Sequence, residues 1–177
     1  TPVSWQTSLT NLIGSGELSL GRAELEVVTG KAAGYAAVVD NSTNDGIAVM
    51  AESLGTNGSD LLLNGVARTA GANNTFWRTD VRLFNPNDQA LEISMESLGV
   101  AAGNGMISKL VPAHSLMELM DVLGPEGFGF PEGSAGALRF HASQSFMLAG
   151  RTSNIDPQGV RPGTYSAYQQ AVPFDAG

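Results

Sequence analysis

The sequence predicts an all-β protein, an antiparallel β-sandwich with one short helix, and three features lead to this prediction. Apolar and polar residues alternate with a period of two in several segments, as on strands that bury one face. Turn-forming residues interrupt the chain roughly every 8–12 residues, the spacing of sandwiches and barrels. Glycine accounts for 22 of the 177 residues, and 42 % of the residues are hydrophobic, so the chain has both frequent turns and material for a core.

Strands are predicted where this alternation is clearest, at 22–28, 79–85 and 90–98. The turn sequence NPND lies between the last two, so 76–98 is predicted to form a β-hairpin whose register is set by Pro86. In this hairpin Trp77 is expected at the core or its edge, with Asp80 and Arg82 on the wet face. Further strands are expected at 34–39, 46–52, 60–68, 105–111, 135–142, 145–151 and 163–171.

One helix is predicted near 115–123. Ser115 and Glu118 have the spacing of a capping box, and Gly124 is placed to end the helix. The apolar residues of this segment share one helical face and are expected to be core: Leu116, Leu119, Met120 and Leu123.

The sequence also repeats itself, with a period of about 106–111 residues. The segment from Pro2 to Gly14 matches the segment from Pro112 to Gly124, 110 residues further on. The segment from 34 matches that from 145, and between these RAELEVV resembles AGALRFH. The segment ending at Gly71 matches the end of the chain, and the matches keep their order.

The repeat divides the chain into three parts. Residues 1–64 are expected to be a partial first repeat and 65–171 a complete one. Residues 172–177 are expected to be the start of a further repeat or an exchanged strand. The chain is therefore expected to begin midway through one repeat, and the segment 71–99 occurs once.

The run GxxxTFWRTDVRLFNP, a Pro-led segment, the strand GALRF and a strand ending in AGRT together resemble a tandem β-sandwich repeat of secreted and cell-surface bacterial proteins. That family is largely uncharacterised and is similar to immunoglobulin-like modules, so the resemblance implies an immunoglobulin-like sandwich. The matching residues, which the resemblance treats as structural, are Trp77, Arg78, Thr79, Asp80, Asn85, Pro86 and Arg151.

Composition argues against several classes of partner and chemistry. The net charge is −8 and only nine residues are basic, whereas nucleic acids and anionic membranes bind clustered Lys and Arg. No apolar run reaches the length of a membrane span. The absence of Cys excludes disulfides and thiolate sites. Charged residues make up 15 % of the chain, against roughly 25 % in an average soluble domain, as in many secreted β-proteins.

No catalytic motif is present, and the chain is expected not to be an enzyme. His114 and His141 lack metal-ligand spacing, and no serine has the surroundings of a nucleophile elbow. A Ser-His-Asp site whose residues come together only in the fold is not excluded by the sequence.

The sequence offers candidate residues for two kinds of binding site. Asp40, Asn44 and Asp45 are the candidates for a calcium site, although the spacing of an EF-hand fails and an Asx-rich turn is the alternative. Exposed aromatic residues in a row would bind carbohydrate, and the candidates are Trp5, Trp77, Tyr165 and Tyr168.

The expected function is a non-catalytic structural or adhesive module of a secreted or cell-surface protein. Because the chain starts half a repeat out of step, strand addition from the tail at 169–177 could join subunits head to tail into a filament. The partner is then protein, including further copies of the chain. The alternative is a carbohydrate- or ligand-binding sandwich module.

Overall fold

The protein is described by a computed structural model that covers residues 4–14, 20–39, 46–53, 58–156 and 165–174. The first elements are α1 (Leu9–Ile13), β1 (Tyr35–Val39) and β2 (Gly46–Met50). The remaining elements are β3 (Asp60–Ala70), η1 (Ala72–Asn74), β4 (Phe76–Phe84), β5 (Leu91–Leu98), β6 (Met106–Val111), β7 (Leu116–Leu119), β8 (Ser134–Ala142), β9 (Met147–Ile155), β10 (Tyr165–Gln170) and β11 (Val172–Pro173).

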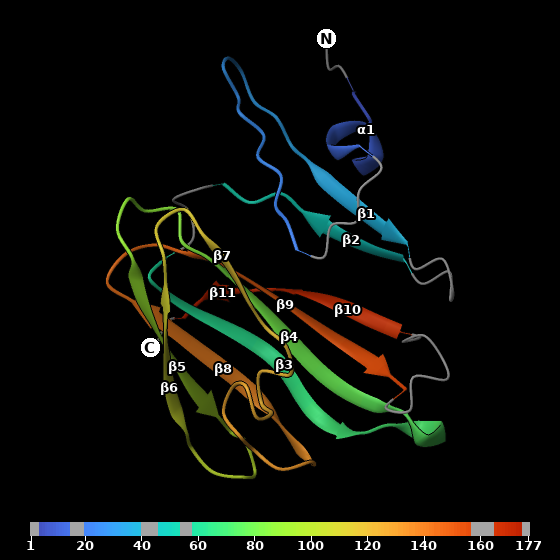
Figure 1. The fold of residues 1–177 in the computed structure, drawn as a ribbon, viewed down its shortest axis with the longest axis vertical. Helices are drawn as coiled ribbons and strands as arrows, with labels where there is room; N and C mark the ends of the chain where they lie inside the picture. Colours follow the sequence, from blue (N-terminus) through green and yellow to red (C-terminus); the bar gives the residue numbers. More distant parts are fainter. Residues whose placement is uncertain (1–3, 15–19, 40–45, 54–57, 157–164, 175–177) are drawn as a thin grey trace.

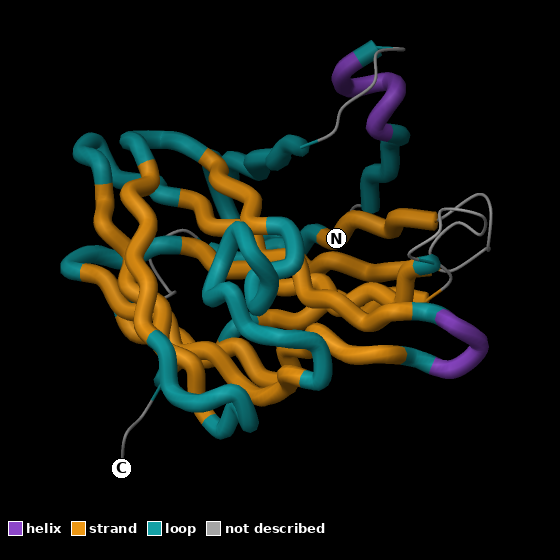
Figure 2. The backbone as a smooth tube through the Cα atoms, turned by 60° about the horizontal axis from the view of Figure 1, so that its bottom comes forward, coloured by secondary structure: helices purple, strands orange, loops and turns teal. Residues whose placement is uncertain are grey.

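All paired strands are antiparallel, so the predicted all-β, sandwich-like class is confirmed. Among the described residues, β1 and β2 form a two-stranded sheet, and the other strands form a nine-stranded sheet ordered β10-β9-β4-β3-β8-β5-β6. β7 pairs with β4, and β11 pairs with β3. The large sheet curves around the core, whereas α1, β1 and β2 lie to one side of it (Figures 1 and 2).

The core consists of the inward-facing residues of the large sheet. On β5 the alternation predicted from the sequence is present, because Leu91, Ile93 and Met95 are buried while Glu92 is exposed. The largest fully buried side chains come from several strands and from two connecting segments, which contribute Leu123 and Phe146. Those on strands include Leu61, Leu63, Leu83, Ile93, Met95, Leu138, Phe140 and Leu148.

A bulge interrupts β3 at Gly65, whose φ of +74° is one that glycine adopts readily. Side chains satisfy the backbone groups that the bulge leaves unpaired. The Ala67 amide donates to Thr79 Oγ1 at 2.9 Å, and Thr79 Oγ1 lies 2.8 Å from Thr152 Oγ1. Gln169 Nε2 donates to the Gly65 carbonyl at 3.1 Å. This small polar network ties β3 to β4, β9 and β10.

The predicted hairpin at 76–98 is wrong. The two segments are the strands β4 and β5, but β4 pairs with β3, β7 and β9, and β5 pairs with β6 and β8. The NPND segment connects these two strands, which are not paired with each other. The buried side chain of Asn85 holds this connection in place. Asn85 Nδ2 donates to the carbonyls of Gln89, Val111 and Pro112 at 2.8–3.1 Å. These contacts fix a connection between distant strands, which local turn chemistry does not distinguish from a hairpin.

The predicted helix near 115–123 is also wrong. Residues Leu116–Leu119 form β7, and turns follow it to Phe128. Glu118 does not close a capping box, since it forms an ion pair with Arg82 of β4 at 2.8 Å. β7 completes the ladder along β4, and the Val122 amide continues it by donating to the Thr79 carbonyl at 2.8 Å. Pairing with β4 therefore overrides the helical pattern.

We call the described residues between 4 and 53 the N-terminal segment. Its helix α1 has no buried residue, and every residue of β1 is exposed. The strand predicted at 22–28 is absent: these residues are exposed and belong to no strand. The segment touches the body through Arg22, whose guanidinium carbon lies 3.9 Å from the Phe84 ring centroid, and β2 lies near β10.

Candidate functional site

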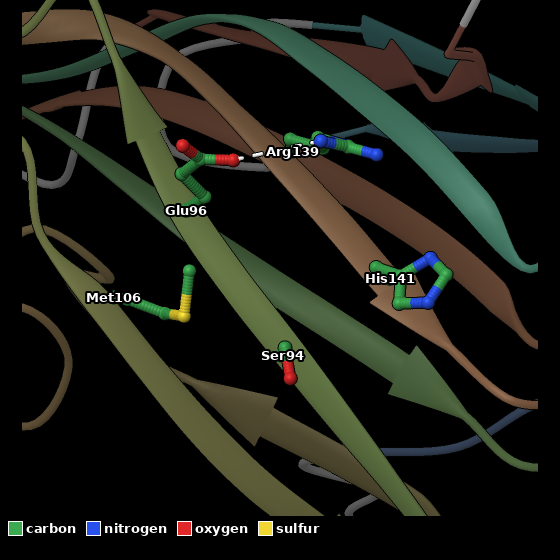
Figure 3. A pocket seen from close by; sticks show the side chains of 5 residues that line it. All are labelled: Ser94, Glu96, Met106, Arg139 and His141. Carbon is green, nitrogen blue, oxygen red and sulfur yellow. Dashed lines mark ion pairs between the residues drawn. The ribbon is translucent and has the colours of Figure 1, made fainter.

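A shallow hollow of about 300 Å³ lies on the outer face of β5, β6 and β8. Its lining residues are Ser94, Glu96, Met106, Arg139 and His141 (Figure 3). They share this face because residues paired across antiparallel strands point to the same side of a sheet. One row of paired positions is Asp60, His141, Ser94 and Ser108, and the next is Leu62, Arg139, Glu96 and Met106.

Arg139 is the centre of the charges at this hollow. Its Nε and Nη2 donate to the two carboxylate oxygens of Asp60 at 2.8 and 2.6 Å, and its Nη1 lies 3.7 Å from Glu96. The hydrogen bonds from Arg139 hold the pKa of Asp60 below its ordinary value, against an opposing effect of burial. The ring of Phe174 covers the guanidinium, with its centroid 4.4 Å from Cζ. Arg139 is therefore fixed by its neighbours on three sides.

Asp60, His141 and Ser94 are the three residue types of a hydrolytic triad on three neighbouring strands. His141 Nδ1 lies 3.4 Å from Asp60 Oδ2. Within the described part of the chain, however, Ser94 Oγ is hydrogen-bonded to Ser108 Oγ at 3.3 Å and not to His141. Asp60 is engaged by Arg139, which leaves it poorly placed to orient the imidazole. In this structure the row forms a polar ladder on the sheet surface and lacks the bond between nucleophile and base.

The predicted aromatic residues do not form one row. Trp5 is 77 % exposed in the N-terminal segment, whereas Trp77 is half-buried against Gly71 at the start of β4. Trp77 lies two residues before buried Thr79 on β4, so the two side chains share one face of the sheet. Tyr168 is paired through Arg151 with Asp80, which lies on the opposite face. Trp77 and Tyr168 thus lie on opposite faces of their sheet. The backbone of Tyr165 pairs with Asn154, the partner of Trp77.

The calcium candidates Asp40, Asn44 and Asp45 lie outside the described residues. In the ranges that the structure does describe, no group of three or more His, Cys, Asp or Glu side chains could hold a metal ion. His114 has a φ of +52°, and its Nε2 lies 2.9 Å from Asp88 Oδ1. His141 is exposed at the hollow.

Sequence reasoning missed the hollow because its residues are far apart in the chain. Asp60 and Arg139 are separated by 79 positions, and only the β3–β8 register makes them neighbours. The sequence did show that Ser94 and Glu96 alternate with the apolar residues of β5, which are buried, and therefore point outward. That signal identifies a wet face, but it does not identify the strands alongside it.

No helix among the described residues is both long and apolar enough to cross a membrane.

The comparisons with known proteins extend to the fold alone. No family model matches the sequence. No curated protein matches it either. A solved structure described as "Crystal Structure of Thermotoga maritima 1070" is similar with a TM-score of 0.53, over 69 % of this chain and 99 % of its own. At 8 % sequence identity, this similarity concerns the fold and carries no function.

Proposed function

We propose that this chain is a non-catalytic structural or adhesive module of a secreted or cell-surface protein, joined in series to other modules of its kind. The join is made by the N-terminal segment through strand addition. The observation that carries this proposal is the exposure of apolar residues in that segment, in contrast to the burial of their counterparts in the second repeat.

The sequence repeat pairs Leu9 with Leu119 and Leu12 with Val122. In the second copy these positions are 6 % and 0 % exposed, whereas Leu9 and Leu12 are 56 % and 57 % exposed. Trp5, in the same segment, is 77 % exposed. Exposed apolar side chains that gather on one surface mark interaction sites. The same side chains that build a core in one repeat are thus free to build a contact in the other.

The donor in this proposal differs from the one expected from the sequence. The sequence predicts that the tail adds a strand to another subunit. In the structure β10 pairs with β9, and Val172 and Pro173 pair with Leu62 and Leu61 of the same chain. The Phe174 amide also donates to the Asp60 carbonyl at 3.0 Å. Since 165–174 contributes to its own sheet, the N-terminal segment is the better donor. Deletion of 169–177 would disturb the body and would not test assembly alone.

The carbohydrate-binding alternative loses the support it had from the aromatic residues. It required an exposed row, and Trp77 and Tyr168 lie on opposite faces of one sheet. We therefore place the structural or adhesive module first.

The test is the mass of the protein in solution, measured by light scattering across concentration. We expect association that grows with concentration and weakens when Leu12 and Ile13 are replaced by Ser. The matched control replaces Met106 and Leu110, which are 70 % and 63 % exposed on the body, by Ser. If both double variants associate like the parent chain, the N-terminal segment is not the joining surface.

A further inference from the structure

We infer that the N-terminal segment is the rear half of a second sandwich and that its partner is the front half of another repeat of this type. The front half is β3 to β6, and the rear half is β7 to β11. This inference rests on the proposed function and names the partner that the joining surface fits.

The strand pairs give the first argument. In the complete repeat, β9 and β10 form the one pair in the described residues that lies wholly within the rear half. The pairs that β7, β8 and β11 make are all with front-half strands. By the sequence match β1 corresponds to β9, and β2 and β10 are each the next strand along the chain, although no sequence match relates these two. The pair β1–β2 is the one strand pair in the described N-terminal segment. A pair of this kind is what a rear half can form without a front half.

The missing strands give the second argument. Residues 22–28 match part of β8, which in the second copy lies between β3 and β5. Without such neighbours these residues form no strand. Residues 6–9 match β7, which pairs with β4, and here they form no strand and lead into α1. The counterparts of β7 and β8, which pair only with front-half strands, therefore form no strands in the N-terminal segment.

The exposed side chains give the third argument. Ile13, at 47 % exposed, matches Leu123, at 0 %. Leu123 belongs to the same core cluster as Leu83 and Ile93 of the front half. A front half that presents apolar residues at these two positions would cover Ile13 in the same way. The partner is thus four antiparallel strands with an apolar inner face, and not a flat polar surface.

The experiment extends the full chain with a second copy of residues 58–111, in which Val111 of the added copy is joined to Pro2. This junction repeats the order at Val111 and Pro112 in the complete repeat. Hydrogen exchange of the β1 amides is measured in the parent and extended chains. A matched control carries Leu83→Asp and Ile93→Asp in the added copy only, which leaves the original body intact. Exchange in β8 and β9 verifies that the body is folded in all three proteins.

We expect exchange of the β1 amides to slow by about 100-fold or more in the extended chain, because a paired and covered strand opens far more rarely than an isolated hairpin. The control should exchange like the parent. Equal β1 exchange in the extended chain and its control would overturn the inference, while association that depends on Leu12 and Ile13 would still support the proposed function. Protection without such association would uphold the inference and remove the evidence that copies join.

Discussion

Asn85 shows how one side chain can hold a connection that has no strand partner of its own. It is completely buried, and its amide donates to three backbone carbonyls while its Oδ1 accepts from the Asn87 amide at 3.0 Å. A buried carbonyl without a donor costs free energy because it has lost its water. The sequence offered Asn85 as a turn residue, but its partners Val111 and Pro112 became visible only in the fold.

Replacement of Asn85 by Ala is expected to lower the free energy of unfolding by about 2–4 kcal/mol, because it leaves several buried carbonyls unpaired at once. Urea denaturation measures this change. Gln89→Ala is the control, since Gln89 contributes only its backbone carbonyl to the network and its side chain is exposed. A loss of less than about 0.5 kcal/mol for Asn85→Ala, the size of an ordinary surface change, would contradict this account.

Asp60 makes a second prediction at the residue scale, which concerns pH. Its pKa is held below the ordinary value, first by the hydrogen bonds from Arg139. A carboxyl group with a lowered folded-state pKa stabilises the protein above its unfolded pKa, and the contribution is lost as pH falls through the folded pKa. The stability difference between the parent and Asp60→Asn should therefore be largest near neutral pH and shrink below about pH 4.

Urea denaturation of both proteins from about pH 7 to pH 2 tests this prediction. Asp88→Asn removes a carboxylate from an exposed corner and controls for net charge. If the difference for Asp60→Asn stays constant over the whole range, then Asp60 acts through its shape and not through its charge.

At the scale of elements, local patterns predicted strands well and their neighbours poorly. The alternation in 90–98 predicted β5 because the period of two reports which face is buried. The segment 115–123 has helical spacing and still forms β7, because the free edge of β4 offers hydrogen bonds that a short helix cannot match. The NPND turn was assigned to a hairpin since turn chemistry is local, whereas the partners of β4 lie up to 79 residues away in sequence.

The bulge in β3 gives a prediction at this scale. Thr79→Val keeps the shape of the side chain but removes the acceptor of the Ala67 amide. We expect a loss of about 1–3 kcal/mol in the free energy of unfolding, the cost of an unsatisfied buried donor. Thr69→Val, on the same strand as the bulge and only half-buried, is the matched control. Equal effects of the two substitutions would mean that Thr79 does not support the bulge.

At the scale of the whole molecule, the chain divides into a body that satisfies its own strands and an N-terminal segment that does not. The all-β class follows from composition and periodicity, which are local along the chain and do not require knowledge of which strands meet. The hollow at Arg139 and the exposure of Leu12 depend on which strands meet. The sequence matches predict a repeat, and the pairing of β1 with β2 and with no other described strand shows that this segment lacks the neighbours its proposed counterpart has.

This division predicts two levels of stability within one chain. A two-stranded sheet is marginal in water by itself, so the β1 amides should exchange through local opening that costs about 1–2 kcal/mol, while amides of β8 and β9 should require global unfolding. Leu83→Ala, which opens a cavity in the core, should lower the protection of β8 and β9 by about 2–5 kcal/mol and leave β1 unchanged. Hydrogen exchange of the parent and variant chains, followed residue by residue, gives both values. A parallel drop in β1 would mean that the N-terminal segment unfolds together with the body, and its exposed apolar residues would then belong to one cooperative unit and not to a half that awaits its partner.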